Sequence, residues 1–299
     1  MKARIISLMA IFSTAFKEWW AKDPFKESAV IAYYAIFSLP GLMVVIITVA
    51  GYFFGHEAVN GQIAGQITST MGADTALQIQ DIVAKATESK NSVWATIIGV
   101  VTILVGATGV FAQFQKSLNL IWGVKATEKK SGLISLLKVR LFSFGLIIAV
   151  AFILVASLVV SALISYLTKW VINNLSESFI IVLQLANFII SLCILALLFA
   201  LMFKIFPDAK IKYRHVWVGS LVTAILFEMG KFALGLYFGK AEPGSGYGAA
   251  GSIILILLWV SYSSMIVFFG AEFTRAYAEL KEGTIPADKY AYKQPKQPK

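Results

Sequence analysis

Charged residues are scarce in this chain, and so are cysteine and histidine. Asp, Glu, Lys and Arg make up 14% of the 299 residues, whereas hydrophobic residues make up 58%. A soluble domain is typically about a quarter charged, so too few charges remain here to cover a soluble surface. The single cysteine, Cys193, has no partner within the chain. The composition therefore excludes an ordinary soluble enzyme, a disordered chain and a small secreted domain held by disulfides.

The residues that support metal or nucleophilic chemistry are also missing. The two histidines, His56 and His215, are expected on opposite faces of a membrane, so they cannot share a metal ion. The sequence contains no G-x-S-x-G motif, no Walker A motif and no cluster of carboxylates suited to two metal ions. A formal dinucleotide fingerprint at Gly246, Gly248 and Gly251 follows no strand, so we reject it. We therefore expect no metal, no cofactor and no enzymatic activity.

Long apolar runs fill the sequence instead. A helix crosses the bilayer with about 20 apolar residues, and six stretches reach that length. Five of them contain such a run without any Asp, Glu, Lys or Arg, and the runs do not alternate as barrel strands do. We expect an all-α polytopic membrane protein in which residues 23–280 form one bundle of six transmembrane helices. The predicted spans are about 28–55, 91–122, 141–168, 178–203, 215–239 and 243–271.

Lys and Arg residues are distributed unevenly between the loops. Of the 26, 20 lie before the first span, after the second, after the fourth or in the C-terminal segment, and 4 lie in the loops on the opposite side. Loops rich in Lys and Arg stay in the cytoplasm, so both termini are predicted to be cytoplasmic. The same charges would attract anionic lipid head groups. No aromatic and basic motif accompanies them, so no nucleic acid is expected as a partner.

Three segments are expected outside the spans. Residues 1–22 are predicted to form an amphipathic helix lying in the cytoplasmic interface, with Asp23 and Pro24 as the N-cap and first residue of the next helix. The segment 57–90 is expected to form two short amphipathic helices on the outer face, and residues 281–299 a disordered basic tail. The apolar face of the first helix repeats in steps of three and four residues, at Ile5, Leu8, Met9, Phe12, Phe16 and Trp19.

The strongest chemical signal is a pair of charges inside the fifth span. Glu228 and Lys231 are three residues apart, so they share a helix face and can form an ion pair. A charge near the middle of the bilayer is costly. One interpretation is a proton or substrate site that faces an internal cavity. The other is a structural ion pair that holds the span in the bundle, with Lys231 reaching toward the interface.

Polar side chains in two further spans are weaker candidates for the same site. Most such residues serve hydrogen bonds between helices, and a cytoplasmic gate or a contact with lipid head groups is the alternative. These residues are Gln113, Gln115 and Asn119 at the end of the second span, and Gln184 and Asn187 in the fourth.

Several short motifs accompany the spans. AVIAYYAIFSLP occupies residues 29–40 shortly after Asp23, FQKSLNLIW ends at Trp122, and FPD occupies residues 206–208. The last span contains YGAAGS, LW and GAEFTR. Together these motifs resemble the YihY/BrkB family of bacterial membrane proteins, over roughly residues 20–280, with Asp208 where the family motif has Asn. The matching positions are Asp23, Tyr33, Tyr34, Ser38, Pro40, Trp122, Pro207, Tyr247, Gly248, Gly251, Trp259, Gly270 and Glu272.

The resemblance implies a bacterial inner-membrane protein with six helices and a suggested role in lipid or envelope transport. The family name carries an association with serum resistance, and a ribonuclease label once used for some members is regarded as mistaken. We therefore expect a transporter or a translocase of lipids or envelope components, with a polar cavity among the spans. The alternative is a membrane scaffold for envelope integrity, with a solidly packed bundle and fully paired polar residues. A ribonuclease is not favoured, because the metal-binding carboxylates are missing.

Overall fold

The computed structural model describes residues 2–71, 73–88, 109–127, 178–241, 243–289 and 291–294. These residues are mostly helical, and three of their helices are long and apolar enough to cross a membrane: Leu185–Ile205, Tyr213–Ala241 and Gly251–Glu282. The predicted span 141–168 and most of the span 91–122 lie outside the described residues. The helical membrane class is therefore confirmed, and the bundle of six helices remains a prediction.

Two helices begin the chain and meet at a sharp elbow. Helix α1 covers Lys2–Trp20, and helix α2 covers Pro24–Phe54 with its proline in the first turn. Asp23 is the N-cap of α2 and Pro24 its first residue, as predicted, although the Asp23 side chain makes no capping hydrogen bond. The reason is its left-handed backbone, with φ 50° and ψ 61°, since a capping side chain needs an extended residue. The Asp23 carbonyl instead accepts a hydrogen bond from the N–H of Glu27, at the start of α2.

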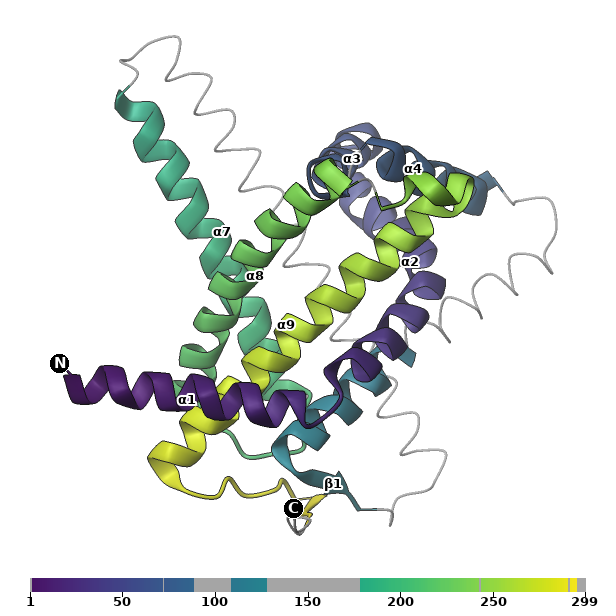
Figure 1. The fold of residues 1–299 in the computed structure, drawn as a ribbon. Helices are drawn as coiled ribbons and strands as arrows, with labels where there is room; N and C mark the ends of the chain where they lie inside the picture. Colours follow the sequence, from purple (N-terminus) through teal and green to yellow (C-terminus); the bar gives the residue numbers. More distant parts are fainter. Residues whose placement is uncertain are drawn as a thin grey trace.

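Three long helices form the centre of the molecule. Helix α7 covers Ser178–Ile205, α8 covers Tyr213–Ala241 and α9 covers Gly251–Glu282. Helix α8 packs against both α7 and α9, and α2 packs along α9 (Figure 1). A further helix over 109–122 joins them near their lower ends. The buried core lies there, and its largest side chains include Trp122, Phe203, Leu118, Ile211 and Val216.

Helices α8 and α9 cross closely because two glycines face two threonines. A Cβ atom on Gly219 would overlap the Thr274 side chain, and one on Gly270 would overlap Thr223. Each threonine hydroxyl donates a 2.7 Å hydrogen bond to a carbonyl of its own helix, Thr223 to Gly219 and Thr274 to Gly270. The polar atoms at this crossing are therefore satisfied without water, and the small residues allow the two backbones to approach.

The last long helix differs from the predicted span 243–271 at both ends. Residues Ser245–Ala250 form a 3-10 helix, η2, and α9 begins only at Gly251. The backbone of Gly251 lies against that of Gly244, at a distance that leaves no room for a Cβ atom. At the other end α9 continues to Glu282, because the charged residues that closed the predicted span have partners there.

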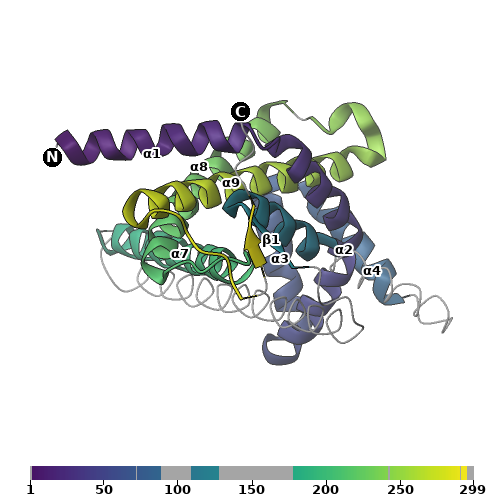
Figure 2. The ribbon, with the colours of Figure 1, turned by 90° about the horizontal axis from the view of Figure 1, so that it is seen from below.

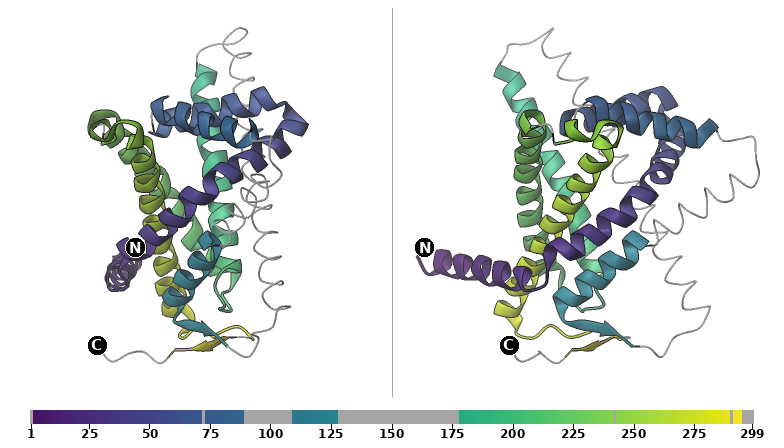
Figure 3. Two further views of the ribbon diagram at one scale, coloured as in Figure 1. Left: turned by 90° about the vertical axis from the view of Figure 1, so that its right-hand side faces the viewer. Right: turned by 45° about the vertical axis from the view of Figure 1, so that its right-hand side comes forward.

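Short elements cover both ends of the central helices. Helices α3 (His56–Met71) and α4 (Ala73–Glu88) lie across one end, called the top below. Helix α1 lies across the opposite end, called the base, at a steep angle to α9 (Figures 1 and 3), and Figure 2 shows this end from below. Strands β1 (Val124–Ala126) and β2 (Ala291–Lys293) lie at the base too (Figure 1). The two chain segments predicted to share the cytoplasmic side therefore lie at the same end.

The C-terminal segment is more ordered than predicted. Strands β1 and β2 form an antiparallel pair in which Lys125 lies opposite Tyr292. The Lys293 ammonium donates a 2.8 Å hydrogen bond to the carbonyl of Trp122, and the side chain of Ile285 is buried. The disorder predicted for 281–299 is therefore wrong for the described part of that segment. Its polar composition suggested disorder, because composition gives no information on backbone pairing with a strand more than 160 residues away in the sequence.

Candidate functional site

A charge network at the base is centred on Glu272, whose side chain is fully buried. Its Oε1 forms an ion pair with the ammonium of Lys22, in the turn after α1, and its Oε2 lies 3.0 Å from the Arg275 guanidinium, one turn along α9. Glu18 of α1 accepts a 3.2 Å hydrogen bond from Arg275 and lies 3.7 Å from the Lys22 Nζ. These four residues, called the base network below, join α1 to α9 through alternating charges.

A second carboxylate, Glu27 in the first turn of α2, lies beside the base network. Its Oε2 accepts hydrogen bonds from Gln113 Nε2 at 2.7 Å and from Ser117 Oγ at 2.6 Å, which tie α2 to the helix over 109–122. Lys22, Glu27, Ser117 and Glu272 border one cavity of about 10 Å³ with otherwise largely apolar walls. A cavity of that size holds about one water molecule. Two buried or half-buried carboxylates thus share a space in which little else fits.

A third polar group surrounds Asp208, in the connection between α7 and α8. Asn119 makes two hydrogen bonds with it: its Nδ2 donates to Asp208 Oδ2 at 2.7 Å, and its Oδ1 accepts from the Asp208 N–H at 2.8 Å. Gln115 Nε2 lies 3.5 Å from both carboxylate oxygens. The Asp208 carbonyl accepts from the N–H of Asp288 at 2.8 Å. Gln115 and Asn119 therefore hold the connection, which in turn binds the C-terminal segment.

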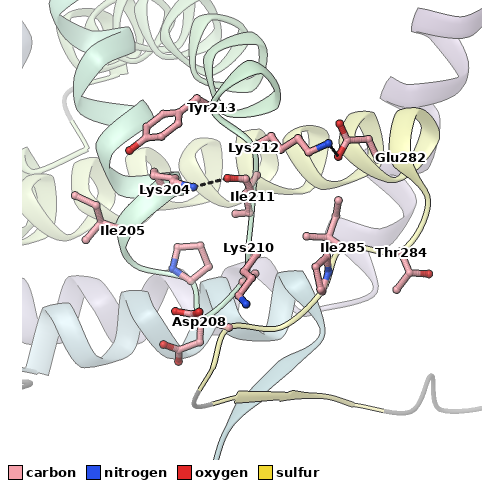
Figure 4. A pocket seen from close by; sticks show the side chains of 14 residues that line it. Lys204, Ile205, Asp208, Lys210, Ile211, Lys212, Tyr213, Glu282, Thr284 and Ile285 are labelled. Carbon is pink, nitrogen blue, oxygen red and sulfur yellow. Dashed lines mark hydrogen bonds and ion pairs between the residues drawn. The ribbon is translucent and has the colours of Figure 1, made fainter.

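A crevice of about 920 Å³ opens at the base between this connection and the segment after α9 (Figure 4). Lys204 donates to the carbonyl of Ile211, and its ammonium also lies 4.6 Å from the centre of the Tyr213 ring. Lys212 points to Glu282, at 3.0 Å. Because three lysines and three carboxylates line the crevice, its wall carries no net charge and does not favour an anion.

Beside the crevice, a buried histidine touches the end of α9. His215 is fully buried, and its Nε2 lies 2.8 Å from Glu282 Oε1. Lys212 and Arg214 approach the same carboxylate at 3.0 and 3.5 Å. The His215 Nδ1 has no hydrogen-bond partner among the described residues. This group fastens the first turn of α8 to the last turn of α9.

The pair that the sequence singled out lies far from the base network along α8. Lys231 Nζ lies 2.7 Å from Glu228 Oε2, so the predicted ion pair forms. Both partners belong to one helix, and both side chains are partly exposed. In the fourth predicted span, Asn187 Oδ1 is buried without a hydrogen-bond partner among the described residues, whereas the side chain of Gln184 lies outside what the structure describes. Those predicted polar residues whose side chains the structure describes therefore do not gather into one site.

The remaining motif positions serve mainly helix packing. The Tyr34 ring lies where a Cβ atom of Gly109 would stand, Ser38 donates to the carbonyl of Ala35, and Trp259 contacts Phe227 edge to face. Tyr33 and Tyr247 are exposed, and Trp122 and Pro207 are buried. The side chain of Pro40 and the burial of Gly248 lie outside the described features. Among the described residues, no group of three or more His, Cys, Asp or Glu residues could hold a metal ion.

The predictions missed Glu18, Lys22, Glu27 and Arg275 for one reason. We located spans as stretches without charge, so the charged residues that ended those stretches counted as loop residues. Glu27 directly precedes the first predicted span and Glu272 directly follows the last. A signal was nevertheless present, because the motif GAEFTR places a carboxylate and a guanidinium one helical turn apart at the end of an apolar helix.

Comparison with known proteins finds one family model and relatives that are named membrane proteins. The family model described as Virulence factor BrkB matches residues 15–295. A UPF0761 membrane protein of Saccharophagus degradans is 26% identical over 93% of this chain, and one of Pseudoalteromonas atlantica is 27% identical over 93%. The chain spans 62% of the length of the first relative and 91% of the second. No solved structure matches the chain significantly.

Proposed function

We propose that this chain, which belongs to the Virulence factor BrkB family, is a bacterial inner-membrane transporter or translocase for a lipid or another envelope component. The base network is its gate on the cytoplasmic side. The observation that carries the proposal is the fully buried Glu272, held by cations from the elbow after α1 and from its own helix. Opening requires Lys22 to release Glu272, which would separate α1 from α9 at the base.

Energetics support a moving part at this place. A buried ion pair gives little net stability, because removing charges from water costs several kcal/mol and apolar side chains of similar size often do as well. Packing alone therefore does not call for a carboxylate at position 272. A network that can exchange partners suits a two-state contact. The water-sized cavity beside Glu27 corresponds to the closed state of such a gate.

The position of α1 supports a location at the membrane surface. Its buried residues Ile11 and Ala15 pack on Phe273 of α9. Large apolar side chains remain exposed on its other side, at Met9, Phe16 and Trp20. An amphipathic helix with such a stripe lies in the bilayer interface. The excess of Lys and Arg in segments at this end supports a cytoplasmic base, facing anionic head groups.

A scaffold without transport activity is the second candidate, and a specific observation favours it. Polar partners are present for Gln113, Gln115, Asn119, Glu228 and Lys231, and the cavity between Glu27 and Glu272 holds about one water molecule. A solidly packed bundle with paired polar groups is what a scaffold requires. A closed gate has the same appearance, so an assay of movement must separate the two candidates.

Lipid movement in reconstituted vesicles tests the proposal. Purified protein is placed in vesicles of phosphatidylethanolamine and phosphatidylglycerol that carry a trace of fluorescent phospholipid of either kind. Dithionite, which does not cross the bilayer, then destroys the label on the outer leaflet. We expect the protein to expose the inner-leaflet label, and Glu272→Gln to speed this exposure, because the variant lacks the charge that holds Lys22 and keeps the gate closed. Glu57→Gln makes the same chemical change on an exposed side chain of α3 and should have no effect.

A reversible cross-link separates gating from folding. Phe12 of α1 and Phe269 of α9 have stacked rings with centres 6.2 Å apart. Cysteines at both positions, in a Cys193→Ser background, can be joined by a reducible bifunctional thiol reagent. Joining them should stop lipid movement, and reduction should restore it. If vesicles with the wild-type protein expose no more label than protein-free vesicles, the result would favour the scaffold. Lipid movement that persists in the cross-linked protein would exclude α1 as the gate.

A further inference from the structure

The elbow between α1 and α2 contains an unassigned pocket of about 430 Å³ lined by Trp20, Asp23, Pro24, Phe25 and Lys26. The Trp20 and Phe25 rings meet edge to face at 5.8 Å, and 57% and 59% of these residues remain exposed. Such a surface, with two exposed aromatic residues beside one positive and one negative charge, is typical of the head-group region of a bilayer.

Asp23 is available for a ligand. It is the only residue other than glycine with a positive φ among the described residues. Its carboxylate would ordinarily cap α2, but it makes no capping hydrogen bond. The side chain is exposed, and no hydrogen bond or ion pair to it is found among the described residues. The pocket therefore presents one anion at Asp23 and one cation at Lys26, next to two aromatic faces.

An apolar stripe leads from this pocket along both helices. On α1 the exposed residues Met9, Phe12, Phe16 and Trp20 follow one another in steps of three and four, which places them on one face. On α2 the exposed residues Phe25, Tyr33 and Phe37 follow in multiples of four, and the Tyr33 and Phe37 rings are in contact. The pocket lies at the corner where the two stripes meet.

We propose that this elbow pocket binds the phosphoethanolamine head group of a membrane phospholipid, whose acyl chains lie along the α2 stripe. The primary ammonium donates to the Asp23 carboxylate and lies against the aromatic faces, as cations do over Trp and Phe rings. The phosphate pairs with the Lys26 ammonium. A choline head group has no N–H to donate to Asp23, and a glycerol head group has no cation for it. The charge pattern of the pocket thus selects a zwitterionic head group with a primary amine.

The proposal concerns binding and does not require lipid to be moved, so it can fail or succeed independently of the gate. Delipidated protein in detergent is mixed with equal amounts of dioleoyl phosphatidylethanolamine, phosphatidylcholine and phosphatidylglycerol, and bound lipid is counted by native mass spectrometry. We expect phosphatidylethanolamine to be preferred about tenfold in the wild type. Asp23→Asn should remove this preference, and it should fold normally because asparagine also tolerates the left-handed backbone.

Two further variants complete the test. Lys26→Gln should weaken the binding of all three lipids alike, since each carries the phosphate that Lys26 binds. Glu57→Gln, at the opposite end of the molecule, should bind as the wild type does. Equal binding of all three lipids, a preference for phosphatidylglycerol, or an unchanged preference in Asp23→Asn would each overturn the proposal. A phosphatidylethanolamine preference in a protein that moves no lipid would leave this pocket established and the proposed gate refuted.

Discussion

Two of the ion pairs between a glutamate and a lysine, Glu228 with Lys231 and Glu272 with Lys22, are built in opposite ways. Glu228 and Lys231 lie one turn apart on α8, and 17% of the Glu228 side chain is exposed. Glu272 and Lys22 are 250 residues apart in sequence, and Glu272 is fully buried. The first pair lies on the surface of a single helix, whereas the second connects the turn after α1 to α9. A buried charge that connects two elements is the better candidate for a working part, although it is harder to see in a sequence.

The largest expected effect tests the Glu272 side of this comparison. Glu272→Gln leaves Lys22 and Arg275 with Glu18 as their only acidic partner in the base network. Breaking a buried pair from one side costs about 3–5 kcal/mol, so the free energy of unfolding of the purified protein should fall by about that amount. Chemical denaturation in mild detergent measures it. A loss no larger than that of Glu228→Gln would show that burial does not distinguish the two pairs.

Sequence reasoning reached one half of this comparison and missed the other for a physical reason. Periodicity and hydropathy predict where apolar helices run, and they placed α2, α7 and α8 within a few residues of their ends. The i, i+3 spacing of Glu228 and Lys231 is a local property, so their pairing could be predicted too. The partners of Glu27 and Asp208, and the Lys22 partner of Glu272, come from distant segments, so their pairing depends on how the helices pack. The pairing of β1 with β2 depends on the same long-range packing.

A change of intermediate size concerns the Asp208 group, whose contacts also join distant segments. Asp208→Ala would leave the Asn119 amide without its acceptor, at a cost of about 1–3 kcal/mol for an unsatisfied polar group. It should also loosen the C-terminal segment, so trypsin should cleave after Lys289 or Lys293 faster than in the wild type. Asp208→Asn keeps an oxygen acceptor and is the residue that the family motif carries, so it should behave nearly as the wild type. Equal cleavage of the alanine variant and the wild type would show that β1 and β2 hold the segment unaided.

The smallest expected effect belongs to the pair inside α8. Partly exposed pairs one turn apart contribute at most about 1 kcal/mol, and Lys231 can extend along the helix toward the interface when its partner is removed. Glu228→Gln should therefore lower the free energy of unfolding by less than about 1 kcal/mol, and the double change Glu228→Gln with Lys231→Met should recover that loss. Neither variant should alter lipid movement in the vesicle assay. Denaturation curves of both variants, measured beside Glu272→Gln, complete the comparison. A loss of several kcal/mol in the single variant would mean that Glu228 has a partner beyond the described residues. Loss of lipid movement in a stable Glu228→Gln protein would show that the functional site lies in the middle of α8 and not at the base.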